Sequence, residues 1–167
     1  MLLDISTKKY PDVFAMVDDE DFERVSRFKW SGLRGTSKTV YAIRSSERDK
    51  HSGKRKTIYL HREILGATGP VDHRDMNGLN NTKHNLRVSD RSKNMANTVK
   101  ISGTTSKYKG VTFSKRDAVY FSRIGFDNKI THLGNFKNED DAAKAYDRAA
   151  RNLFGTFARL NFPEVEA

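Results

Sequence analysis

The sequence predicts an α+β protein built from two parts, and three patterns carry that prediction. Short apolar or alternating runs bounded by turn residues predict strands through much of the chain. One long amphipathic run near the C-terminus predicts a helix that packs on such strands. A small, polar segment at residues 101–105 predicts a linker, so the expected domains are residues 1–100 and residues 106–167.

The first part is expected to be rich in β-structure. Residues 14–17 (FAMV), 39–44 (TVYAIR) and 57–65 (TIYLHREIL) are apolar or alternating runs that predict strands. The acidic segment from Asp18 to Trp30 predicts a short helix that brings Phe22, Val25 and Trp30 to a core. Residues 45–56 are polar, basic and glycine-bearing, which predicts a hairpin loop.

Residues 66–100 predict the order strand, loop, strand, helix. Gly69 and Pro70 mark a turn before the first strand, and residues 77–81 (NGLNN) are rich in turn formers. The second strand (LRV) runs into a short helix, for which Ser89 or Asp90 is a suitable N-cap.

The last part predicts a three-stranded antiparallel sheet packed on one helix. The strand-like runs are residues 108–113, 119–126 and 130–136. Asn138 is expected to cap the following helix, and Gly155 is expected to end it. The apolar stripe of this helix repeats at helical spacing: Ala142, Ala145, Tyr146, Ala149 and Leu153.

The charge of the chain indicates a polyanionic partner. The 167 residues carry a net charge of +10, and residues 1–30 hold five bases and seven acids, so the excess lies in the rest. Such an excess favours nucleic acid over the alternative of a merely solubilising surface, and it suits DNA and RNA equally. The chain has no cysteine, which excludes disulfides and a cysteine-ligated structural zinc.

The stretch from Val71 to Asn94 contains the residue types of a metal-dependent phosphodiesterase. Asp72 and Asn94 offer a carboxylate and an amide oxygen, which suit Mg²⁺ or Mn²⁺ better than zinc. His73 can take a proton from water near neutral pH. The alternative is that these residues are turn formers in a polar loop.

The motif LHREILG followed by VDHRDMNGLNNTKHNLRVSDRSKN resembles the HNH endonucleases of the phage and intron-homing type. The resemblance implies a ββα-metal unit with Asp72 and Asn94 as metal ligands, His73 as general base and Asn85 as the residue that braces the loop. It implies Mg²⁺, with Mn²⁺ as the alternative, and a phage protein in the host cytoplasm. The N-terminus lacks a basic leader, and no apolar run approaches the ~20 residues of a membrane span, so neither secretion nor a membrane is expected.

Other polar residues of this region are given simpler roles. Asn80 and Asn81 are interpreted as turn formers. His61 and His84 are interpreted as structural or DNA-facing, and His51 receives no role.

Residues 106–163 resemble the Apetala-two/ethylene-response-factor DNA-binding domain, through YKGV, LGNF, AAKAYDRAA, FG and ARLNFP in the order of that family. The resemblance implies a sheet that enters the major groove and a helix that packs on its back. It assigns DNA contacts at or near these positions: Lys109, Thr112, Ser114, Arg116, Phe121, Arg123 and His132. Strand alternation places Phe121 and Arg123 on one face and Ser122 and Ile124 on the other.

Lys109 is predicted to contact phosphate because it begins its strand, and Arg123 is predicted to contact a base edge. Plant members of the family have arginine where this chain has Thr112 and Gly125, and an acid where it has Arg123, so their target sequence does not carry over. The two resemblances together therefore predict a metal-dependent HNH endonuclease that a C-terminal module directs to double-stranded DNA. One alternative is a DNA-binding regulator with an inactive HNH unit. Another is an RNA-binding protein, which the charge would suit equally but which no aromatic strand motif in the sequence supports.

Overall fold

The computed structural model describes residues 1–35, 39–100 and 103–163. The chain divides into two compact units, Met1–Asp90 and Arg91–Ala167. This division falls earlier in the chain than the predicted boundary at Lys100, because helix α3 (Arg91–Ala96) packs with the second unit. Ile101 and Ser102 of the predicted linker lie outside the described residues. Mixed helices and small antiparallel sheets agree with the α+β prediction.

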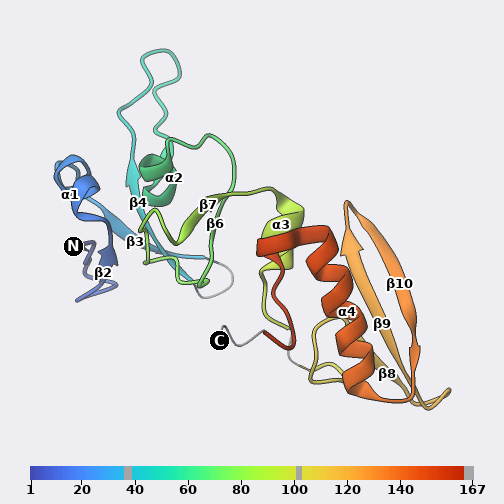
Figure 1. Ribbon diagram of the computed structural model, residues 1–167. Coiled ribbons are helices and arrows are strands. Elements are labelled where there is room, and N and C mark those ends of the chain that lie inside the picture. The colour runs from blue at the N-terminus through green and yellow to red at the C-terminus, as the bar shows by residue number, and fades with distance from the viewer. Residues whose placement is uncertain (36–38, 101–102, 164–167) are drawn as a thin grey trace. The chain divides into compact units, whose positions relative to one another are not determined.

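The first unit contains three small antiparallel sheets (Figure 1). Strand β1 (Leu2–Asp4) pairs with β2 (Phe14–Met16). The sheet β3 (Ser31–Arg34), β4 (Val40–Ser45) and β5 (Thr57–Tyr59) follows helix α1 (Asp19–Ser26). Strand β6 (Val71–His73) pairs with β7 (Leu86–Val88), as the predicted strand, loop, strand order requires.

One apolar core holds these elements together. Ile5, Val25 and Leu60 are fully buried in it. Trp30 is 2% exposed, and its Nε1 donates to the carbonyl of Val25 at 2.8 Å. The indole therefore reaches the core with its polar group satisfied, as the sequence predicts, although α1 itself ends at Ser26.

The prediction of a single strand over residues 57–65 is wrong in its second half. The strand β5 ends at Tyr59, and helix α2 (Leu60–Leu65) begins directly after it. Leu60 and Ile64 are both buried one helical turn apart, and Gly66 ends the helix at a φ of 61°. Burial at helical spacing therefore overrides the strand propensity of this apolar run.

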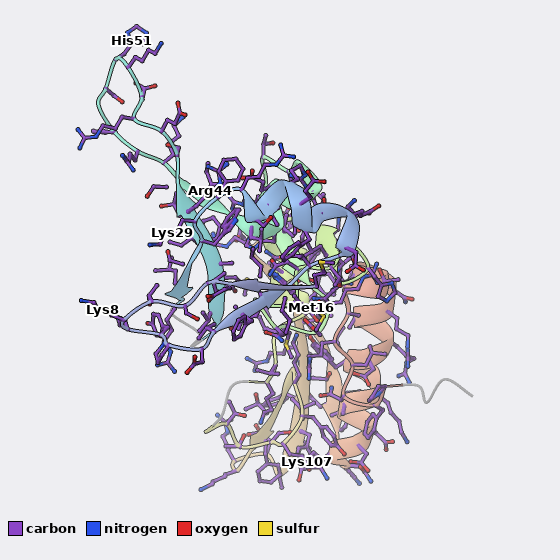
Figure 2. All side chains as sticks on the ribbon, turned by 90° about the vertical axis from the view of Figure 1, so that its left-hand side faces the viewer. Lys8, Met16, Lys29, Arg44, His51 and Lys107 are labelled. Carbon is purple, nitrogen blue, oxygen red and sulfur yellow. The ribbon has the colours of Figure 1, made fainter. Side chains whose placement is uncertain are left out.

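The segment between β4 and β5 forms the predicted hairpin loop. Its backbone pairs Ser46 with Lys56 and Asp49 with Lys54, and its tip is exposed. Figure 2 shows His51 at this tip, far along the loop from Arg44 on β4.

The second unit has the predicted sheet and helix. Strands β8 (Val111–Ser114), β9 (Val119–Phe126) and β10 (Lys129–Phe136) are antiparallel in the order β10-β9-β8. Helix α4 (Glu139–Phe154) packs against all three strands, and η1 (Gly155–Phe157) follows it (Figure 1). Within the described residues, no helix has the length and hydropathy needed to cross a membrane.

The ends of α4 agree with the prediction, and its apolar stripe is corrected. The Asn138 side chain accepts from the backbone N–H of Asp140 at 2.7 Å, and the helix ends before Gly155. Leu153 is 42% exposed, whereas Phe154 is buried. The buried face of the helix therefore keeps Ala142, Ala145 and Tyr146, leaves out Leu153, and also includes Ala143, Ala150 and Phe154.

Candidate active site

The hairpin of β6 and β7 positions Asp72 and His73. Asp72 lies opposite Arg87, and His73 lies opposite Leu86. Nε and Nη2 of Arg87 lie 2.7 and 2.5 Å from Oδ2 of Asp72, and both side chains are largely buried. This ion pair compensates the burial of the Asp72 carboxylate and holds its orientation.

His73 lies in a buried aromatic environment. Its side chain packs at ring-centroid distances of 5.0 Å from His61 and 5.9 Å from Tyr41. Burial lowers the pKa of His73, and the contact with Asn81 and the charges of Asp75 and Asp72 oppose that shift only in part. His73 is therefore a neutral imidazole at neutral pH, which is the form that can accept a proton.

Asn85 braces the loop that joins the two strands. Its Oδ1 accepts from the backbone N–H of Asp75 at 3.1 Å, and its Nδ2 donates to Oδ1 of Asp75 and to the carbonyl of Asn80. Burial acts to raise the pKa of Asp75, but hydrogen bonds from Asn77, Asn80 and Asn85 outweigh it and the pKa is lowered. The charged carboxylate of Asp75 therefore accepts hydrogen bonds from both ends of the loop that follows His73.

Asn81 is a residue that the sequence interpretation missed. It is fully buried, its backbone N–H donates to Met16, and its Nδ2 donates to the carbonyl of Gly78 at 3.4 Å. Its Oδ1 lies 3.5 Å from Nε2 of His73 in a long hydrogen bond. Because an amide oxygen only accepts, this contact favours the tautomer with the proton on Nε2. Asn80, by contrast, makes the turn bonds that its interpretation predicts.

His61 is the second histidine of this buried environment. It stacks on Tyr59 at 5.2 Å, and burial with the nearby His73 and Arg62 lowers its pKa to about 3. Its Nδ1 is buried and makes no hydrogen bond within the described residues. The prediction of a structural role agrees with this placement. The feature that indicates such a role is the position of the histidine directly after Leu60, in a short helix in which Leu60 and Ile64 are buried. His84 is exposed.

The four predicted site residues are divided between the units. Asp72, His73 and Asn85 meet on the β6–β7 hairpin of the first unit. Asn94 lies in α3 of the second unit. Its Oδ1 is buried, and no described residue donates a hydrogen bond to it.

The candidate metal ligands are both hard oxygen donors. An amide oxygen that is buried without a donor is costly, and a divalent cation is one partner that would satisfy it. Within the described ranges, no group of three or more His, Cys, Asp or Glu residues is arranged for a metal ion. A pair of one carboxylate and one amide is not such a group, and its chemistry fits Mg²⁺ or Mn²⁺.

The open face of the C-terminal sheet gathers the predicted DNA-contacting side chains. Thr112 pairs with Phe121, and Arg123 pairs with His132 across neighbouring strands. The Arg123 guanidinium lies 5.4 Å from the Phe121 ring, and the His132 ring lies 5.8 Å from it. Ser122 and Ile124 are buried under α4, so the predicted division of β9 into two faces is confirmed. The register adds Ile130 and Asn135 to the open face.

Three other predicted contacts lie at the edge of this face or outside it. Ser114 is the last residue of β8, on the same face as Thr112, and its hydroxyl donates to Asp117 of the following turn. Arg116 extends from that turn with a 93% exposed side chain. Lys109 does not extend from the sheet. Its Nζ donates to the carbonyls of Met95, Ala96 and Thr98. This placement corrects the predicted phosphate contact, because backbone oxygens already occupy all three N–H donors.

Comparison with known proteins points in the same two directions. The chain is 33% identical over 153 residues to an uncharacterized HNH endonuclease of Acanthamoeba polyphaga mimivirus, which covers 89% of this chain and 74% of that protein. It is 43% identical over 58 residues to APETALA2-like protein 2 of Oryza sativa, covering 35% of this chain and 13% of that protein. An AP2-like ethylene-responsive transcription factor of Arabidopsis thaliana is likewise 43% identical over 58 residues, which cover 35% of this chain and 12% of that protein.

The plant relatives therefore match about a third of this chain, and this chain spans a small part of their length. No family model matches the sequence. The viral relative covers the nuclease-like part and most of its own length. With Asp72, His73 and Asn85 on one hairpin, the chain belongs to the HNH endonuclease family.

Proposed function

We propose that this protein is a metal-dependent DNA endonuclease of the homing type, which hydrolyses phosphodiester bonds and is directed to its target by the C-terminal unit. The observation that carries the proposal is the buried, neutral imidazole of His73 next to the Asp72 carboxylate on strand β6. Membership of the HNH family supplies the reaction class.

His73 acts as the general base. With the Nε2 proton directed toward Asn81, the lone pair on Nδ1 takes the proton of the attacking water. The water oxygen forms the new bond to phosphorus, and the bond to the 3′ oxygen breaks. The products are a 5′-phosphate and a 3′-hydroxyl, which takes its proton from solvent. Asn85 and Asp75 keep the loop behind His73 in place during this step.

Asp72 and Asn94 would hold the divalent ion, Mg²⁺ by preference and Mn²⁺ as the alternative. Bound there, such an ion neutralises charge on the scissile phosphate and stabilises the leaving oxygen. The ion pair with Arg87 holds the Asp72 carboxylate in its orientation. The chain carries one HNH motif and therefore one active site. A single chain is expected to cut one DNA strand in each binding event.

The open face of the C-terminal sheet provides the DNA contact. Arg123 stands at its centre beside Phe121 and His132, where a guanidinium can reach a guanine edge in the major groove. One of the plant relatives reported above is named as a transcription factor, which supports DNA as the ligand of this unit. The target sequence of this chain differs from the target sequences of the plant proteins, because the residues on this face differ from the plant pattern.

The test is incubation of supercoiled plasmid with the full chain, with Mg²⁺ and with chelator in excess. We expect nicking that depends on the metal, and a loss of ~10²–10⁴-fold in rate for His73→Ala. His84→Ala is the matched control, because His84 is an exposed histidine of the same loop. Binding without cleavage by the wild-type chain under every divalent ion would favour a DNA-binding regulator with an inactive HNH unit. Unimpaired cleavage in excess chelator would exclude the metal mechanism.

A further inference from the structure

Helix α3 is held in place by the C-terminal module. Ala96 at its end is 4% exposed and packs in a cluster with buried residues of β9 and α4: Ile124, Tyr146, Ala150 and Phe154. The backbone N–H of Arg159 donates to the carbonyl of Ala96 at 3.2 Å, and Nζ of Lys93 lies 5.4 Å from the ring of Phe157. A helix of six residues is unstable by itself, so these contacts decide whether α3 forms.

Lys109 caps the C-terminal end of α3. Its Nζ lies 2.5 Å from the carbonyl oxygen of Ala96, 2.8 Å from that of Thr98 and 3.3 Å from that of Met95. The last carbonyls of a helix lack partners within it and carry the negative end of the dipole, so an ammonium there satisfies both needs. Burial and the charge of Arg159 lower the pKa of Lys109 to about 8, so the side chain still carries three N–H donors at neutral pH.

The backbone of Lys109 is itself fixed to the interior of the module. Its N–H donates to Oδ1 of Asn161 at 2.7 Å, and its carbonyl accepts from Nδ2 of Asn161. Asn161 is in turn bonded by Asp147, a buried carboxylate of α4 that accepts its N–H at 2.8 Å. A continuous set of hydrogen bonds thus runs from α4 through Asn161 and Lys109 to the end of α3.

We infer that Lys109 is a positioning residue that holds α3, and with it Asn94, in the conformation that the metal site needs. Asn94 precedes the capped carbonyls by one turn or less and carries the buried amide oxygen without a donor. The inference rests on the proposed function for the role of Asn94. On this inference the C-terminal module has a structural role in the nuclease in addition to binding DNA. The side chain of Lys109 contacts the protein interior and does not contact phosphate.

The variants that test this are Lys109→Met and Lys109→Arg in the full chain, with Lys107→Met as the matched control. Lys107 is an exposed lysine two positions earlier, whose Nζ lies over the ring of Tyr108. For Lys109→Met we expect the backbone amides of residues 91–98 to exchange hydrogen about tenfold faster or more, the scale of one lost charge-assisted hydrogen bond. The Mg²⁺ concentration for half-maximal cleavage should rise by about the same factor, with partial rescue by Lys109→Arg.

DNA binding separates this role from a phosphate contact. The salt dependence of DNA affinity should be unchanged in Lys109→Met, whereas a lost phosphate contact would flatten the log–log slope by about one unit. A flattened slope with unaltered exchange of α3 would overturn the inference. The exchange and slope measurements do not need cleavage, so they decide the role of Lys109 even if the protein proves not to be a nuclease.

Amine labelling of the wild-type chain provides a test that does not depend on the folding of any variant. Lys109 should react with an amine-acylating reagent more slowly than Lys107, with DNA and without it, because its Nζ is enclosed by carbonyls. A Lys109 that reacts as fast as Lys107 in the free protein and is protected only by DNA would refute the inference.

Discussion

Replacement of His61 by phenylalanine should make the first unit markedly more resistant to acid. Phenylalanine keeps the stacking on Tyr59 and the packing on His73, and it removes an Nδ1 that is buried without a hydrogen bond. At about pH 7 the free energy of unfolding should therefore be unchanged or slightly higher, because no satisfied polar group is lost.

The effect of pH follows from the lowered pKa of His61. In the unfolded chain a histidine takes up its proton near pH 6.5, whereas in the folded protein the pKa of His61 is about 3. Below pH 6.5 the unfolded state binds this proton and the folded state does not, so stability is lost as the pH falls toward 3. The loss is about 1.4 kcal/mol for each pH unit, or roughly 2–3 kcal/mol at about pH 4.5. The variant lacks this loss.

Urea unfolding followed by the fluorescence of Trp30 measures this difference. Trp30 is the sole tryptophan and is buried in the first unit, so its signal reports that unit. Wild type and variant should diverge between about pH 7 and about pH 4.5, while groups common to both cancel. His51→Phe, on the exposed loop, controls for the removal of a histidine as such. Parallel pH dependences in wild type and His61→Phe would show that His61 is not held neutral.

Three further predictions concern the loop, the sheet and the module. Asn81→Ala should lower the cleavage rate by ~10–10²-fold in a nicking assay without a change in DNA affinity, because the contact that favours one tautomer of His73 is lost. Asn77 is an exposed residue of the same loop, and an equal loss of cleavage in Asn77→Ala would contradict a specific role for Asn81. Arg123→Gln should weaken DNA binding by about 1–3 kcal/mol on particular sequences in a mobility-shift series; Lys144→Gln on α4 should have little effect. Gly110→Ala should destabilise the second unit by roughly 2–4 kcal/mol in a thermal melt, because the added Cβ would lie 2.0 Å from the Tyr146 ring and the backbone φ is 76°. The control is Gly103→Ala, where φ is similar but the space is open, and it should cost about 1 kcal/mol.

Several elements could be predicted because their signals are local. The side chain of Asn138 bonds a backbone amide two residues away, so the start of α4 depends on neighbouring residues alone. The alternation of β9 predicts its buried and open faces because side chains alternate along any strand. The residues of the short helix α2 predict a strand instead, because a run of six residues gives too little periodicity to distinguish a helix from a strand.

The roles of Asn81 and Lys109 have no local signature in the sequence. Asn81 looks like any turn asparagine until the loop places its amide oxygen at His73. The position of Lys109 before a strand suggests a phosphate contact, but its side chain donates to carbonyls at the end of α3, which precede it by 11 to 14 residues. The boundary between the units moves for the same reason, because the burial of Ala96 depends on residues of α4.

The sequence by itself determined the residue types at the candidate site, the strand, loop, strand, helix order of the segment that carries them, and the charge that favours nucleic acid. These follow from the chemistry of single side chains and from periodicity over a few residues. The tertiary structure alone decided which of these side chains are buried, which residue contacts the imidazole of His73, and to which unit the helix bearing Asn94 belongs. Burial and hydrogen bonding between distant segments depend on which surfaces meet in the folded chain, and a linear pattern does not contain that information.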